Sequence, residues 1–155
     1  MFNLITFTIA VHGLSAAIWV GGMFFAYICL RPSLGQLEPP QRLQLWGQVF
    51  RRFFAWVWIV AAALPLTGNF LIVAIYGGFA NAGVSVHIMN GVGWIMIVLF
   101  AVLYFIPYRR FNAAVGNQDW SLAAKNLNTI RQIVAINLAL GLIVIAIATS
   151  GRYWG

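Results

Sequence analysis

The chain has 155 residues, of which 63% are hydrophobic and only 7% are charged, and its formal net charge is +7. This composition supplies too little polar surface for a soluble globule, so it predicts an integral membrane protein surrounded by the lipid bilayer. Because membrane topology accounts for almost all of the basic residues, nucleic acid is excluded as the expected partner.

Four apolar segments follow one another at about 4–30, 54–76, 84–107 and 132–150. Each is close to the roughly 20 residues that a helix needs to cross about 30 Å of hydrocarbon. The pattern predicts an all-α fold, an integral membrane four-helix bundle that forms one domain over residues 1–155. The first segment lacks a positive start and a small-residue cleavage pattern, so we expect it to remain as a helix.

Two connections carry helical patterns of their own. Pro39-Pro40 opens one at about 39–52, and Asp119 can cap the other at about 119–129. Both patterns predict separate interfacial helices on the cytoplasmic surface of the bilayer.

Eight of the nine basic residues lie in or beside the first and third connections, and the second connection, around residues 77–85, has none. Because basic residues near helix ends stay in the cytoplasm, we expect these two connections to be cytoplasmic and both termini to lie outside. The eight residues are Arg31, Arg42, Arg51, Arg52, Arg109, Arg110, Lys125 and Arg131.

The chain has only two histidines, and both occur in the same local sequence pattern. His12 is followed seven residues later by Trp19, and His87 is followed at the same spacing by Trp94. The two patterns are 75 residues apart, about half the chain. They predict two parallel helix-pair repeats related by a pseudo-twofold axis along the membrane normal. Further matched positions are Ser15 with Asn90 and Ala16 with Gly91.

Both histidines are predicted to lie at the same depth. His12 is 19 residues before Arg31, and His87 is 22 residues before Arg109. At 1.5 Å per residue each histidine lies roughly 30 Å from the cytoplasmic boundary, near the outer face. The repeat places them opposite one another across its axis.

Paired histidines inside a membrane bundle indicate a functional site, since ionisable groups there are costly. Two imidazoles from facing helices suit the axial positions of a haem b iron, and the single Cys29 excludes a thioether-attached haem. Ala16 and Gly91 leave room one turn away from the histidines. The other candidate cofactor-binding residues are Trp19 and Trp94 as aromatic walls, Asn90 as an orienting group, and Arg152 as a partner for haem propionates.

Two alternatives stay open. His87 and Met89 offer the imidazole and thioether ligands that suit copper, although Cys29 lies roughly 25 Å from His12 along the same helix. The histidines could instead form only hydrogen bonds between helices. Gly13, Ala17 and Gly21 recur every four residues and are expected to allow close packing of helices.

The stretch from His12 to Phe25, with its Trp19-Val20-Gly21-Gly22 turn, resembles the first helix of the CopD (copper resistance protein D) family. Arg51-Arg52 and Leu66-Thr67-Gly68 fit that family too. The resemblance implies a four-helix protein of the bacterial inner membrane, and it raises copper transport or resistance as a function.

CopD-like domains are also similar to HemJ, the four-helix protoporphyrinogen oxidase family, whose first and third helices each carry a histidine tied to haem. On that comparison His12 and His87 are the matching positions. HemJ has a lysine two residues after its second histidine, where this chain has Met89. This difference counts against the enzyme.

The sequence therefore favours a haem b protein with His12 and His87 as metal ligands near the periplasmic face. Because two protein ligands fill both axial positions, electron transfer is the expected activity, with a quinone or a periplasmic redox protein as partner. A HemJ-like oxidation of a porphyrinogen and a copper function of the CopD type are the alternatives. An oligomer is compatible with the sequence.

Overall fold

The structure is a computed structural model that describes residues 3–153, except for the side chain of Arg152. Four continuous helical stretches, Leu4–Gln36, Pro39–Tyr76, Val84–Gly116 and Trp120–Ser150, are long and apolar enough to cross a membrane. Within residues 3–153 there is no strand, so the all-α, four-helix prediction is confirmed. The elements are α1 (Leu4–Phe24), η1 (Phe25–Leu30), α2 (Arg31–Ser33), η2 (Leu34–Gln36), α3 (Pro39–Tyr76), η3 (Phe79–Asn81), α4 (Val84–Leu103), η4 (Tyr104–Tyr108), α5 (Arg109–Gly116), α6 (Trp120–Ser150) and η5 (Gly151–Tyr153).

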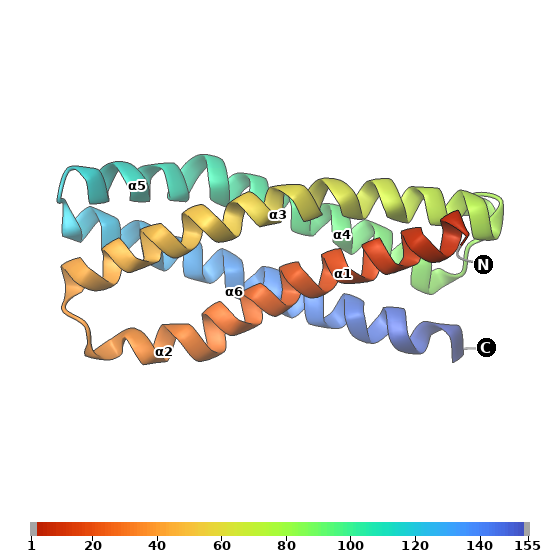
Figure 1. Cartoon of the computed structure of the whole chain (residues 1–155), viewed down its shortest axis with the longest axis horizontal. Coiled ribbons are helices and arrows are strands. Elements are labelled where there is room, and N and C mark those ends of the chain that lie inside the picture. The colour runs from red at the N-terminus through yellow and green to blue at the C-terminus, as the bar shows by residue number, and fades with distance from the viewer. Residues whose placement is uncertain (1–2, 154–155) are drawn as a thin grey trace.

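The four stretches run side by side as a long bundle, and both ends of the chain lie at the same end of it (Figure 1). We call this the terminal end. The opposite end, which holds the connections between Gln36 and Pro39 and between Gly116 and Trp120, is called the basic end. α1 packs mainly against α3, and α4 packs mainly against α6. This pairing matches the two helix pairs that the sequence predicts, whereas a symmetry axis between them stays a prediction.

The separate surface helices predicted at 39–52 and 119–129 are corrected by the structure. α3 runs unbroken for 38 residues and α6 for 31, so each predicted segment is the first part of a long helix. The cause lies in the buried face of each helix, which continues without interruption through the predicted boundary. In α3 the continuous buried residues are Leu43, Trp46, Phe50, Phe54 and Val57. In α6 the buried residues are Ala123, Asn126, Leu127 and Ile130 before the predicted boundary, and Asn137, Leu138 and Gly141 after it.

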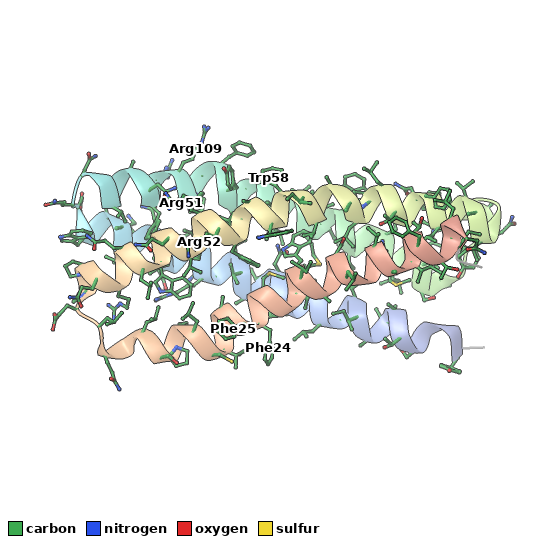
Figure 2. All side chains as sticks on the ribbon, viewed as in Figure 1. Phe24, Phe25, Arg51, Arg52, Trp58 and Arg109 are labelled. Atoms are coloured by element: carbon green, nitrogen blue, oxygen red, sulfur yellow. The ribbon has the colours of Figure 1, made fainter. Side chains whose placement is uncertain are left out.

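At 1.5 Å per residue α3 is about 57 Å long, almost twice the thickness of the hydrocarbon layer. Figure 2 shows Arg51, Arg52 and Arg109 between the basic end and the middle of the bundle, and α3 continues from Arg51 towards the basic end as far as Pro39. Phe24, Phe25 and Trp58 lie nearer the middle of the bundle (Figure 2). Their apolar side chains are 45%, 59% and 37% exposed. Such a girdle of exposed apolar groups with charges beyond it suits a bilayer.

The first and third helical stretches both change to a π-helix next to a proline. η1 precedes Pro32, and η4 contains Pro107. Proline lacks an N–H and crowds the carbonyl four residues earlier, so a widened turn relieves the contact and lets the helix continue. Both stretches thereby reach the basic end instead of stopping at the proline.

Buried apolar residues are concentrated in the middle and at the basic end. In α4 the first buried residue is Met96, and in α6 the last is Gly141. Around the basic half, Phe50 and Phe54 stack with ring centroids 5.1 Å apart and meet Tyr108 edge to face. The terminal end therefore has a sparser interior than the rest of the bundle.

The start of α6 provides a test of local stability. Asp119 accepts a hydrogen bond of 3.0 Å from the backbone N–H of Leu122, as its predicted capping role requires. Asp119→Ala is expected to lower the free energy of unfolding by about 1 kcal/mol because this N–H loses its acceptor. Thermal unfolding in detergent measures the effect. Asp119→Asn keeps a capping oxygen and serves as the control, so an equal loss in both variants would contradict the capping role.

Candidate functional site

His12 is held against α3 by a hydrogen bond. Its Nδ1 lies 2.7 Å from the hydroxyl oxygen of Thr67, and the imidazole is half-buried. The same hydroxyl lies 2.6 Å from the backbone carbonyl of Ala63, which can only accept. The hydroxyl oxygen also lies 3.2 Å from the carbonyl of Leu64. Because a hydroxyl has one hydrogen, we assign that hydrogen to a carbonyl and let the oxygen accept from Nδ1–H of His12. On this assignment Nε2 carries no hydrogen in the neutral imidazole.

Gly68 makes this approach possible. A Cβ added at Gly68 would lie 3.2 Å from Cε1 of His12, closer than most real contacts of this kind. The absence of a side chain at Gly68 lets the imidazole lie against α3 beside Thr67. The sequence already marks Leu66-Thr67-Gly68 as a motif but does not connect it with His12, since that contact spans 55 residues.

His87 has different surroundings. It lies in the first turn of α4, is exposed, and its ring centroid is 6.1 Å from that of Phe79. Nearby Asn90 is half-buried, and Gly91 is exposed with no atom within 4 Å of an added Cβ. Over residues 3–153 no hydrogen bond or ring contact joins His87 to His12, so their pairing stays a prediction.

The two tryptophans of the repeated pattern lie in unlike places. Trp19 is only 3% exposed and packs edge to face on Phe100, with ring centroids 6.1 Å apart. Trp94 is 48% exposed. Ala16 is half-buried, one turn beyond His12. The side chain of Arg152 lies outside the described part of the chain. Of these candidate residues Gly91 and Trp94 are exposed, whereas Ala16 and Asn90 are half-buried and Trp19 is buried.

The candidate donor groups at the terminal end are His12, His87 and Met89. Among the described residues no group of three or more His, Cys, Asp or Glu side chains lies close enough together to hold a metal ion. Met89, two residues after His87, is half-buried.

Thr67→Val is expected to weaken the positioning of His12 without breaking the bundle. The Nδ1–H loses its acceptor, at a cost of about 1 kcal/mol, and the neutral imidazole populates both tautomers. Nitrogen-15 NMR of histidine-labelled protein measures the tautomer ratio. Thr149→Val is the matched control, because the Thr149 hydroxyl bonds only to carbonyls of its own helix. An unchanged His12 signal in Thr67→Val would contradict the assigned tautomer.

Comparison with known proteins gives one result. The family model described as copper resistance protein D matches residues 47–150, about two thirds of the chain. The matched region contains Thr67, Gly68 and His87 but begins after His12. No curated protein and no solved structure matches the chain. With four helices capable of spanning a membrane and this match, the chain is a multi-pass membrane protein that belongs to the CopD family.

Proposed function

We propose that this CopD-family protein is a b-type haem protein that transfers electrons, with His12 and His87 as the axial ligands near the periplasmic face. The hydrogen bond between His12 and Thr67 is the observation that supports this most directly. A metal-ligating imidazole needs one free nitrogen, and its other N–H is commonly fixed by a hydrogen bond. With the proton assigned to Nδ1, Thr67 fixes that N–H of His12 and Nε2 is the nitrogen proposed to bind the iron.

The arrangement of the helices also supports the proposal. α1 and α4 belong to different packing pairs, and buried residues become sparse at the end where both histidines lie. Ala16 and Gly91 add little or no side-chain volume one turn beyond each histidine. A flat ring held between the two pairs would cover the faces of α1 and α4 that carry the histidines.

When bound, the haem would supply a one-electron couple. The residues of the chain would fix its position: His12 through Nε2, and Thr67 by holding the orientation of that imidazole. Ligation by both histidines would leave no axial position for oxygen, which favours electron transfer over oxygen chemistry. The partners proposed are a quinone in the outer leaflet or a periplasmic redox protein.

Copper binding is the second candidate, because the matching family model is described as copper resistance protein D. In this chain His87 and Met89 would be the first ligands to consider, as imidazole and thioether groups suit copper. Cys29 is exposed and lies far along the first helical stretch, so it would not complete that site.

One set of spectra tests the proposal. The protein is purified in mild detergent, and absorption is recorded in the oxidised and dithionite-reduced states for wild type, His12→Ala and His87→Ala. We expect a six-coordinate b-type spectrum with a sharp reduced α-band, lost or converted to a five-coordinate form in either variant. Cys29→Ser is the control and is expected to keep the wild-type spectrum.

Elemental analysis of the same samples distinguishes the two candidates. Iron bound in proportion to the protein, and lost in the histidine variants, would support the haem proposal. A colourless wild type after haem supplementation, carrying stoichiometric copper that His87→Ala loses, would overturn it in favour of the copper site.

A further inference from the structure

A second candidate site lies at the basic end, remote from both histidines. A cavity of about 520 Å³ is lined by arginines from three elements: Arg31 of α2, Arg42 of α3 and Arg131 of α6. The guanidinium group of Arg31 also lies over the ring of Tyr27, 5.0 Å from its centroid. Three cationic groups brought to one cavity by three separate segments are typical of an anion site.

No acidic residue neutralises this cluster. The chain has two acidic residues, Glu38 and Asp119, and neither lines the cavity. The cavity instead brings the like charges of Arg31, Arg42 and Arg131 together. Holding three like charges together is unfavourable unless an anion from outside the chain joins them.

Two buried hydrogen-bond donors point to the same ligand chemistry. The Nε of Arg131 and the indole Nε1 of Trp46 are both buried without an acceptor in the described structure. Both residues line a smaller, apolar cavity that shares Tyr27, Arg31 and Arg131 with the larger one. Buried donors are nearly always satisfied, so an unpaired N–H on Arg131, one of the three cations, and another on Trp46 mark a part of the bundle that is short of acceptors.

The form of that ligand follows from the geometry of the donors. A planar carboxylate pairs well with one arginine, whereas a tetrahedral phosphate can accept from several directions at once. The cavity also lies at one end of a membrane-spanning bundle, where the headgroups of lipids are found, and basic pockets between such helices bind anionic headgroups.

We propose that Arg31, Arg42 and Arg131 form a binding site for a phosphate group, supplied by the headgroup of an anionic phospholipid. The arginine guanidinium groups contact the phosphate oxygens, and the aromatic residues beside them face the glycerol and the start of the acyl chains. The bound lipid neutralises the cluster and ties together the first, second and fourth helical stretches at the basic end.

Thermal unfolding in mixed micelles tests this site. Dioleoylphosphatidylglycerol is added to the delipidated, detergent-purified full chain, with dioleoylphosphatidylcholine as the zwitterionic comparison. We expect the anionic lipid alone to raise the unfolding temperature in a saturable way, because a ligand that binds only the folded state stabilises it. Arg131→Gln and Arg42→Gln are each expected to weaken the apparent affinity for the anionic lipid roughly tenfold, through loss of a charged hydrogen bond.

Arg109→Gln is the matched control, since it removes the same charge from an exposed residue that does not line the cavity. It is expected to respond to lipid like wild type. If Arg131→Gln does not fold, the same lipid titration is measured on Arg42→Gln and on the conservative variant Arg42→Lys. Equal stabilisation by both lipids, or an equal loss in Arg109→Gln, would overturn the proposal. Stabilisation by sodium phosphate to the same extent as the lipid would support the phosphate site and overturn the lipid as its source.

Discussion

Gly141→Leu is expected to destabilise the bundle by about 3 kcal/mol, because the added side chain has no space to enter. A Cβ at Gly141 would lie 2.7 Å from Cγ2 of Val20 and 3.2 Å from Cε of Met96. Both neighbours are almost fully buried, at 5% and 4% exposed. Gly141 is thus the point at which α6 receives side chains from α1 and α4, and a leucine would push the helices apart.

Equilibrium unfolding by denaturing detergent, followed by circular dichroism, measures this change. Gly21→Leu is the control, because it makes the same substitution within a long helix where an added Cβ meets no atom within 4 Å. The control is expected to retain wild-type stability or to gain slightly from the better helix propensity of leucine. Equal stability of the two variants would show that Gly141 is not a close-packing position.

The contrast between these glycines shows where sequence reasoning reaches its limit. The repeat of Gly13, Ala17 and Gly21 predicts a close helix contact, but all three residues are exposed in the structure. The close contacts occur instead at other glycines, including Gly22, which lies against the ring of Phe53. Spacing identifies a face of a helix, but it does not say which face meets a neighbour when every face is apolar.

The number of membrane-spanning helices was predictable because hydropathy and length together constrain it. The first residues of the second and fourth helices were harder to predict, because a polar stretch within a long helix resembles a connection between helices. Arg51 and Arg52 fall within α3 and are exposed. Phe50 and Phe54, which flank them in the sequence, are buried on the opposite side of the helix. A charged pair inside a helical pattern therefore does not by itself mark the end of the helix.

The candidate site was foreseen in part. The sequence singled out His12 and His87 because ionisable groups are rare in apolar segments. It missed the hydrogen bond from His12 to Thr67, because that contact depends on how α1 rotates against α3. It also treated the two histidines as equivalent, whereas one is half-buried and the other exposed. Local sequence patterns can match while the neighbouring helices differ.

Gly91→Leu is expected to abolish haem binding while the fold is retained. This prediction rests on the proposed function. Gly91 lies four residues after His87, on the same face of α4, and an added Cβ meets no atom within 4 Å. The leucine therefore clashes with nothing in the protein and improves helix propensity by about 1 kcal/mol. A haem ring lying over this face would meet the leucine side chain directly. The haem-to-protein ratio and thermal stability, measured on one preparation, separate loss of the cofactor from loss of the fold.

Gly93→Leu is the matched control for this prediction. It is also in α4 with no atom within 4 Å of an added Cβ, but it lies two residues further on, away from the face that carries His87. We expect it to bind haem like wild type. Full haem binding in Gly91→Leu would mean that the ring does not cover this face of α4, and loss in both variants would mean that the effect does not depend on the face. Either result would contradict the proposed placement, whereas loss in Gly91→Leu alone would locate the ring beside His87.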